Sequence, residues 1–91
     1  MNPLQIAVSG GHTMQLAAKE TRTYTWTKQE LGVPDNGRVK DAIYSMENTD
    51  SLTSGFWVAL STTEDSVKIR MYSDRNSLAK CEFRISVLYT I

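Results

Sequence analysis

The amino-acid sequence predicts an all-β fold, a small antiparallel β-sandwich whose last three strands form a meander. Three observations favour this fold. Apolar and polar side chains alternate through residues 80–91, threonine occupies every odd position of residues 21–28, and shorter alternating runs occupy residues 56–60 and 67–72. A period of two places every second side chain on one face of a strand, and β-branched and aromatic residues suit that pleated, half-buried surface.

The length and composition exclude several classes of protein. The 91 residues suffice for one domain, so residues 1–91 are predicted to form a single sandwich. Lysine and arginine number 10 and the acids number 10, so the net charge is zero and no basic stripe predicts nucleic-acid binding. No apolar run is long enough to predict insertion in a membrane. The chain is expected to be soluble and made in a reducing compartment.

The residues that carry metal and catalytic chemistry are scarce. Cys81 is the single cysteine and His12 the single histidine, so neither a disulfide nor a Cys/His metal site is predicted. Cys81 lies on the inward parity of its strand and is expected in the core. The acidic residues fall in predicted loops or on exposed parities, which leaves no paired carboxylates for acid–base catalysis. We therefore expect no enzyme, no metal and no cofactor.

The first third of the chain is predicted to form two strands. Leu4, Ile6 and Val8 alternate and end in a glycine-rich loop at residues 9–11, and alternation resumes from residue 13. In the threonine-rich segment that follows, four side chains share the face opposite the threonines: Arg22, Tyr24, Trp26 and Lys28. This row is either a stacking platform for a sugar or base, or the aromatic half of a core with a cation at each end, and the second interpretation is favoured.

The middle of the chain is less regular. Residues 29–37 are predicted to form a long loop with a turn at residues 34–37, and residues 48–55 a second loop. Between them, apolar residues at i, i+3, i+4 and i+7 suggest a short helix over residues 38–48, whereas the flanking strands favour an irregular strand. Both alternatives stay open, with the strand preferred.

The three strands at the end of the chain are predicted to pair as a meander, through polar linkers at residues 61–66 and 73–79. In the expected register Val58 lies opposite Ile69, and Ile69 opposite Phe83, so that the apolar side chains share one face. On the other face Trp57 lies opposite Arg70, and Arg70 opposite Glu82. This aromatic and charged row is either a solvated sheet surface or a patch that binds a sugar or a second subunit.

The order of these segments resembles a known class of domain. Residues 21–26 (TRTYTW), 55–60 (GFWVAL), 67–72 (VKIRMY) and 81–91 (CEFRISVLYTI) look like the small β-sandwich head domains of bacteriophage tail-fibre and baseplate receptor-binding proteins, some of which are similar to H-type lectins. The resemblance is one of pattern and order over residues 13–91. It implies a virion protein that forms a homo-oligomer, with a trimer favoured, and that contacts host-surface saccharide or other virion proteins.

Two functions follow as hypotheses. The first is a virion structural or host-binding module that recognises a cell-surface glycan or caps an assembly. Its predicted ligand-binding residues are Trp57, Arg70, Tyr72 and Glu82, because an exposed aromatic with polar neighbours suits a sugar ring. Competing candidates are the loop residues Asn48, Asp50 and Asp74. The alternative is a small phage-encoded protein of the host cytoplasm that inhibits a host factor or sequesters a small ligand.

Overall fold

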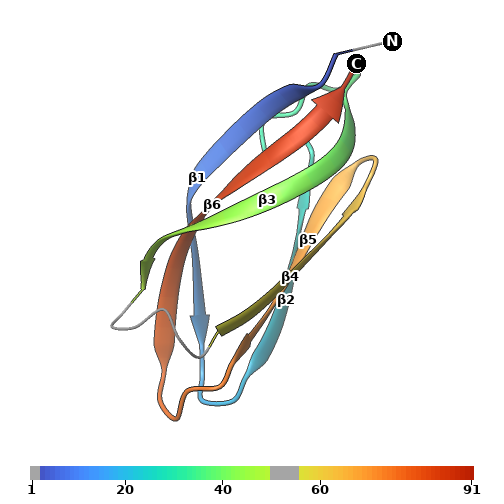
Figure 1. Cartoon of the computed structure of the whole chain (residues 1–91). Helices are drawn as coiled ribbons and strands as arrows, with labels where there is room; N and C mark the ends of the chain where they lie inside the picture. The colour runs from blue at the N-terminus through green and yellow to red at the C-terminus, as the bar shows by residue number, and fades with distance from the viewer. Residues whose placement is uncertain (1–2, 50–55) are drawn as a thin grey trace.

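The computed structural model describes residues 3–49 and 56–91, which form two three-stranded antiparallel sheets and contain no helix. The six strands are β1 (Gln5–Leu16), β2 (Thr21–Thr27), β3 (Arg38–Thr49), β4 (Phe56–Thr63), β5 (Ser66–Ser73) and β6 (Ala79–Thr90). The sheets have the orders β1-β6-β3 and β2-β5-β4, and they stack into an elongated sandwich (Figure 1). The predicted all-β antiparallel sandwich is confirmed. Over the described ranges, no helix is long and apolar enough to cross a membrane.

The central strands of the two sheets supply the core. The inward side chains of β6 include Phe83, Ile85 and Val87, and those of β5 include Ile69 and Met71; all of these are fully buried. Cys81 is buried as well, as its parity predicts. Because both strands have neighbours on either side, they contribute most of the apolar area that folding removes from water.

The predicted meander is wrong in its second half. β4 and β5 do form a hairpin, but β6 belongs to the other sheet, where it pairs with β1 and β3. Ile69 and Phe83 were expected to be cross-strand neighbours, whereas they belong to different sheets and to one core. Alternation reports only which side chains point inward, and it is the same whether two strands lie side by side or face each other across a core.

The register of the β4–β5 hairpin differs from the prediction by two residues. Val58 pairs with Met71 and Trp57 with Tyr72, because the strands extend to Thr63 and restart at Ser66. Only two residues are left in the connection, in place of a six-residue linker. A shift of two keeps every side chain on its predicted face but changes its partner.

A bulge interrupts β1 where a loop was predicted at residues 9–11. The strand runs on through both glycines, and the register against β6 shifts between Ser9 and His12. Gly11 has a φ of 75°, which a residue without a side chain adopts readily. The extra residue reverses the parity, so that Ile6 and Val8 face solvent while Met14 is buried.

β3 is an irregular strand, so the helical alternative for residues 38–48 is wrong. Register shifts occur between Val39 and Asp41 and again between Met46 and Asn48. The first bulge explains the helix-like spacing, because it places Val39 and Ala42 on the same buried face although they are three residues apart. Ile43, the next residue of that stripe, points outward and is 54% exposed.

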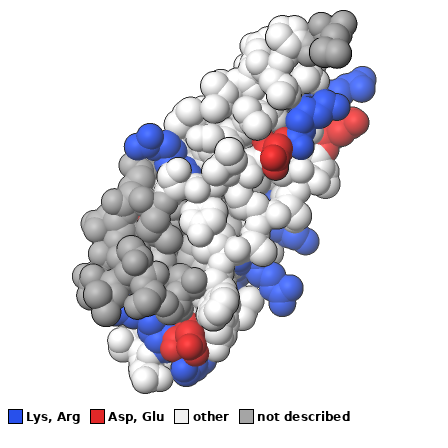
Figure 2. Space-filling view, in the orientation of Figure 1, with Lys and Arg blue, Asp and Glu red and all other residues white. Residues whose placement is uncertain are grey.

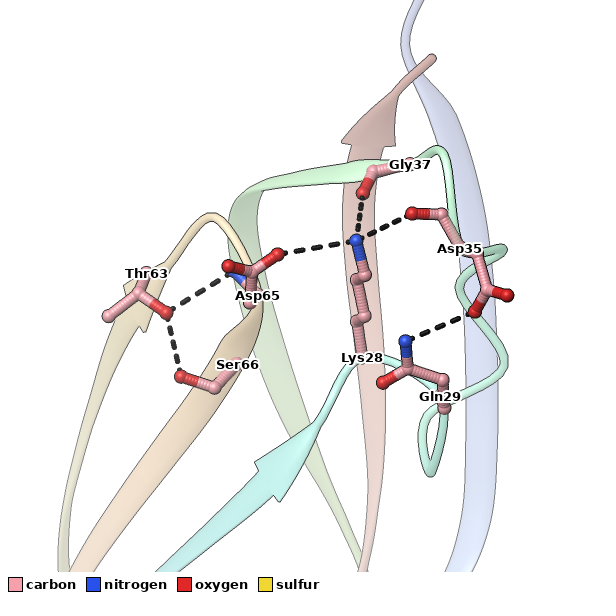
Figure 3. A network of polar contacts seen from close by, with 7 residues as sticks. All are labelled: Lys28, Gln29, Asp35, Gly37, Thr63, Asp65 and Ser66. Carbon is pink, nitrogen blue, oxygen red and sulfur yellow. Dashed lines mark hydrogen bonds and ion pairs between the residues drawn. The ribbon is translucent and has the colours of Figure 1, made fainter.

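Lys28 joins the loop after β2 to the turn between β4 and β5 (Figure 3). Its ammonium group donates hydrogen bonds to the carbonyl oxygens of Asp35 and Gly37, at 2.7 and 3.0 Å, and lies 3.2 Å from an Asp65 carboxylate oxygen. Only 12% of the Lys28 side chain is exposed. The predicted turn at residues 34–37 is present, since the Gly37 amide donates to the carbonyl of Pro34 at 2.8 Å.

Candidate functional site

The outer face of the β2-β5-β4 sheet brings together three of the four residues predicted to bind ligand. Strand pairing sets Thr21, Tyr72 and Trp57 in one row across the sheet, and places Arg70 in the next row. Directly opposed side chains on one face have Cβ atoms about 5 Å apart. Trp57 and Tyr72 are therefore immediate neighbours, and Arg70 is diagonal to Trp57.

These side chains line a shallow hollow of about 430 Å³. The lining residues are Thr21, Trp57, Val58, Ala59, Arg70 and Tyr72. The Trp57 side chain is 66% exposed, and it is unusual for so large an apolar side chain to be left in water. The hollow combines an aromatic surface with a guanidinium, a phenol and a threonine hydroxyl. Such a set stacks on the apolar face of a ring and donates hydrogen bonds to oxygens at its edge.

Two ion pairs brace the turn between β1 and β2, next to this hollow. Lys19 donates to an Asp74 carboxylate oxygen at 2.9 Å, and Arg22 donates to Glu20 at 2.9 Å. The hydrogen bond to Asp74 raises the pKa of Lys19 above its ordinary value. The pKa of Glu20 is lowered, first because the Ala17 amide donates to it at 2.7 Å and second because of Arg22. Thr21 therefore begins its strand from a fixed turn.

Glu82 does not belong to this site, and the predicted row of Trp57, Arg70 and Glu82 is wrong. Because β6 lies in the other sheet, Glu82 is on the opposite outer face, 3.9 Å from Lys80. Arg70 lies opposite Ala59 instead of Trp57. The sequence identified the correct face for three residues and could not identify the strand order that removes the fourth.

Of the three competing loop residues, Asp74 is the one whose side chain the structure describes. Its carboxylate lies 2.9 Å from the Lys19 ammonium group at the β1–β2 turn. Asn48 lies in β3, where its backbone pairs with Glu82 of β6. Asp50 lies outside the described residues.

A second hollow lies between β1 and β2, and of its lining the sequence indicated only the aromatic row of Tyr24 and Trp26. It measures about 280 Å³ and is lined by Gly11, His12, Thr13, Met14, Tyr24 and Trp26. The His12 and Tyr24 rings contact Trp26 at centroid distances of 4.9 and 4.8 Å. The sequence signal for the position of His12 was the pair of glycines within an alternating run. The glycines permit a bulge, and the bulge turns His12 inward.

The row predicted as the aromatic half of the core is only partly buried. Trp26 is in the core and Lys28 is nearly covered, whereas Tyr24 is 48% exposed and Arg22 is exposed. The favoured core interpretation is therefore correct at the carboxyl end of β2. Toward the amino end of β2, the side chain of the same parity, Tyr24, faces the second hollow.

Within residues 3–49 and 56–91, no group of three or more histidine, cysteine or acidic side chains is arranged to hold a metal ion. His12 does meet a hydroxyl, since its Nε2 atom lies 2.8 Å from the Ser9 Oγ atom. Comparison with known proteins gave no match to a family model, to a curated protein or to a solved structure.

Proposed function

We propose that this chain is a non-catalytic, carbohydrate-binding module of a bacteriophage virion, of the tail-fibre or baseplate head kind, and that it works as a homo-oligomer, a trimer in the simplest case. The observation that supports binding is the hollow in which Trp57, Tyr72 and Arg70 lie together. The virion setting rests on the resemblance of residues 13–91 to tail-fibre heads.

The ligand class follows from the chemistry of the hollow. A pyranose ring has an apolar face that packs on an indole, and its hydroxyls accept hydrogen bonds from Arg70 or exchange them with Tyr72 and Thr21. The hollow is open and shallow, which suits a terminal sugar of a surface glycan. Arg70 favours ligands that carry a carboxylate or phosphate, because a guanidinium binds such groups with two parallel hydrogen bonds.

The test is a glycan array that includes bacterial surface polysaccharides, probed with the wild type, Trp57→Ala and Glu82→Gln. We expect Trp57→Ala to weaken binding at least about tenfold, as for a central aromatic contact. Glu82→Gln is the matched control, because that side chain lies on the opposite sheet and its loss should leave binding unchanged. No binding by the wild type to any saccharide, or equal binding by Trp57→Ala, would overturn the proposal.

A second candidate function has support of its own. The hollow lined by His12, Tyr24 and Trp26 suits a small planar ligand, as expected for a host-cell protein that sequesters a metabolite. Tyr24→Ala should then abolish ligand-induced quenching of tryptophan fluorescence, while Trp57→Ala should not. Mass spectrometry of purified phage particles distinguishes the two functions, because only the first function requires the protein to be part of the virion.

A further inference from the structure

The outer face of the β1-β6-β3 sheet carries a patch of large aliphatic side chains, hereafter the aliphatic face: Ile6, Val8, Ile43 and Leu88. Ile6 is 59%, Val8 57% and Ile43 54% exposed, and Leu88 is half-buried. Pairing places Ile6 and Asp41 on either side of Leu88 in one row, and Val8 and Ile43 on either side of Ser86 in the next. The four aliphatic side chains thus occupy two neighbouring rows. In Figure 2 the surface over the upper part of β1 is largely free of charged groups, whereas charged groups lie over the upper part of β3.

We propose that a second copy of this chain covers the aliphatic face, so that the β1-β6-β3 sheet is the homo-oligomer interface. This inference deepens the proposed function, because it assigns assembly and ligand binding to opposite faces of the sandwich. Trp57 and Arg70 then remain open to ligand in the oligomer. A contiguous aliphatic surface of this kind on a small domain marks an interaction site.

The size of the face fits a pair of like surfaces. Strands about 4.8 Å apart and about 40 Å long give three strands a footprint of roughly 14 by 40 Å, or about 550 Å² in projection. Side-chain relief brings the accessible area close to the ~800 Å² that each partner of a stable complex contributes. The aliphatic rows lie at one end of this footprint, and the polar rows toward Thr13 and Gln15 lie at the other.

The charges also favour a second copy over other occupants. The outer side of the sheet carries both signs, with Arg38 and Asp41 on β3 and Glu82 and Arg84 on β6, and Asp41 lies opposite Leu88 within the aliphatic rows. A face with both signs can pair with itself. The net charge of zero removes long-range repulsion between copies. A bilayer surface is a poorer partner, because membrane-binding faces carry a basic rim without acids.

The test compares two double variants by light scattering over a range from micromolar to millimolar concentration. Val8→Glu/Ile43→Glu places two acids in the aliphatic face. The matched control, Thr23→Glu/Thr25→Glu, adds the same charge to the other outer face, opposite Arg70 and Lys68. We expect the wild type and the control to have at least twice the 10.2 kDa mass of one chain, and the aliphatic-face variant to be monomeric.

A monomeric wild type throughout this range would overturn the inference, as would an oligomer that survives Val8→Glu/Ile43→Glu with an unchanged dissociation constant. A folded spectrum by circular dichroism is required of both variants. The more conservative Val8→Thr/Ile43→Thr, which keeps β-branching, should weaken association at least tenfold and covers the case in which the acidic variant does not fold. Saccharide binding by the monomeric variant on the array reports the hollow separately, so failure of the interface and failure of the glycan site are distinguishable.

Discussion

At the scale of single residues, Lys28 makes two charge-assisted hydrogen bonds to carbonyl oxygens beside one ion pair with Asp65. Its ammonium group satisfies two loop carbonyls from a nearly buried position, whereas its charged partner Asp65 is 80% exposed. Exposed ion pairs contribute little, because water screens them and both side chains lose freedom. The carbonyl bonds should therefore account for most of the stability that Lys28 supplies.

Replacing Lys28 and Asp65 separately tests this division. Lys28→Met should lower the free energy of unfolding by about 2 to 4 kcal/mol, because two carbonyls lose their donor in a largely covered site. Asp65→Asn keeps an acceptor oxygen and should cost less than about 1 kcal/mol. Urea unfolding measures both. Equal losses in the two variants would show that the ion pair is the important contact.

Glu20 predicts a dependence of stability on pH at the β1–β2 turn. Its pKa in the folded chain lies below its ordinary value of 4.5, so its contribution is complete above 4.5 and is lost as the pH falls through the lower, folded value. Lys19 has the opposite sign: its raised pKa gives a contribution that is complete below 10.5 and is lost as the pH rises through the folded value.

The measurement is the melting temperature of the wild type and of Glu20→Gln, taken from acidic to neutral pH. Glutamine keeps an acceptor for the Ala17 amide but carries no charge toward Arg22. The wild type should be the more stable protein at neutral pH, and the difference should vanish in acid. A difference that is the same at every pH would exclude the carboxylate as its cause.

At the scale of elements, the bulge in β1 decides which face of the amino-terminal strand is buried. The shift between Ser9 and His12 lets Ala7 and Met14 both face inward although they differ in parity. Deleting Gly11 would remove the extra residue, so that Ala7 and Met14 would have the same parity and would both still face inward. Every side chain of β1 would then keep its face against β6 in uniform pairing.

The deletion of Gly11 should therefore leave a folded domain that keeps most of the several kcal/mol by which a domain of this size is stable. Gly11→Asn is the control, since asparagine tolerates a positive φ and no atom lies within 4 Å of an added Cβ. Thermal unfolding followed by circular dichroism compares them. A deletion variant that does not fold, beside a folded Gly11→Asn, would mean that the core depends on the bulge itself.

The strands themselves were predictable because local alternation determines them, whereas their partners were not. Residues 80–90 and 67–72 have the predicted inward side chains, and Trp57, Arg70 and Tyr72 have the predicted outward ones, whereas Ile91, expected inward, is 45% exposed beyond the end of β6. Which strands pair with each other depends on the lengths of the loops that connect them and on how their side chains pack across the core. The two-residue turn after Thr63 moved Tyr72 opposite Trp57, and the crossing of β6 to the other sheet removed Glu82 from the site.

At the scale of the whole molecule, the two outer faces have different chemistry, and their separation has a consequence for the way the protein binds. One face presents Trp57, Tyr72 and Arg70, and the other presents the aliphatic face. If two copies join through the aliphatic face, their hollows point in opposite directions and cannot reach one flat surface together. The pair therefore links glycans of two separate surfaces and gains no tighter binding to a single surface, because such a gain requires both sites to engage that surface at once.

The monomeric variant Val8→Glu/Ile43→Glu should therefore lose the ability to link two glycosylated surfaces while keeping its affinity for the same saccharide free in solution. Agglutination of glycan-coated beads, beside calorimetry with the soluble sugar, makes the comparison. Trp57→Ala should lose both agglutination and sugar binding and keep its oligomeric mass. An equal loss of agglutination and of solution affinity in Val8→Glu/Ile43→Glu would mean that the aliphatic face and the hollow are coupled, and that the two sides of the sandwich do not act independently.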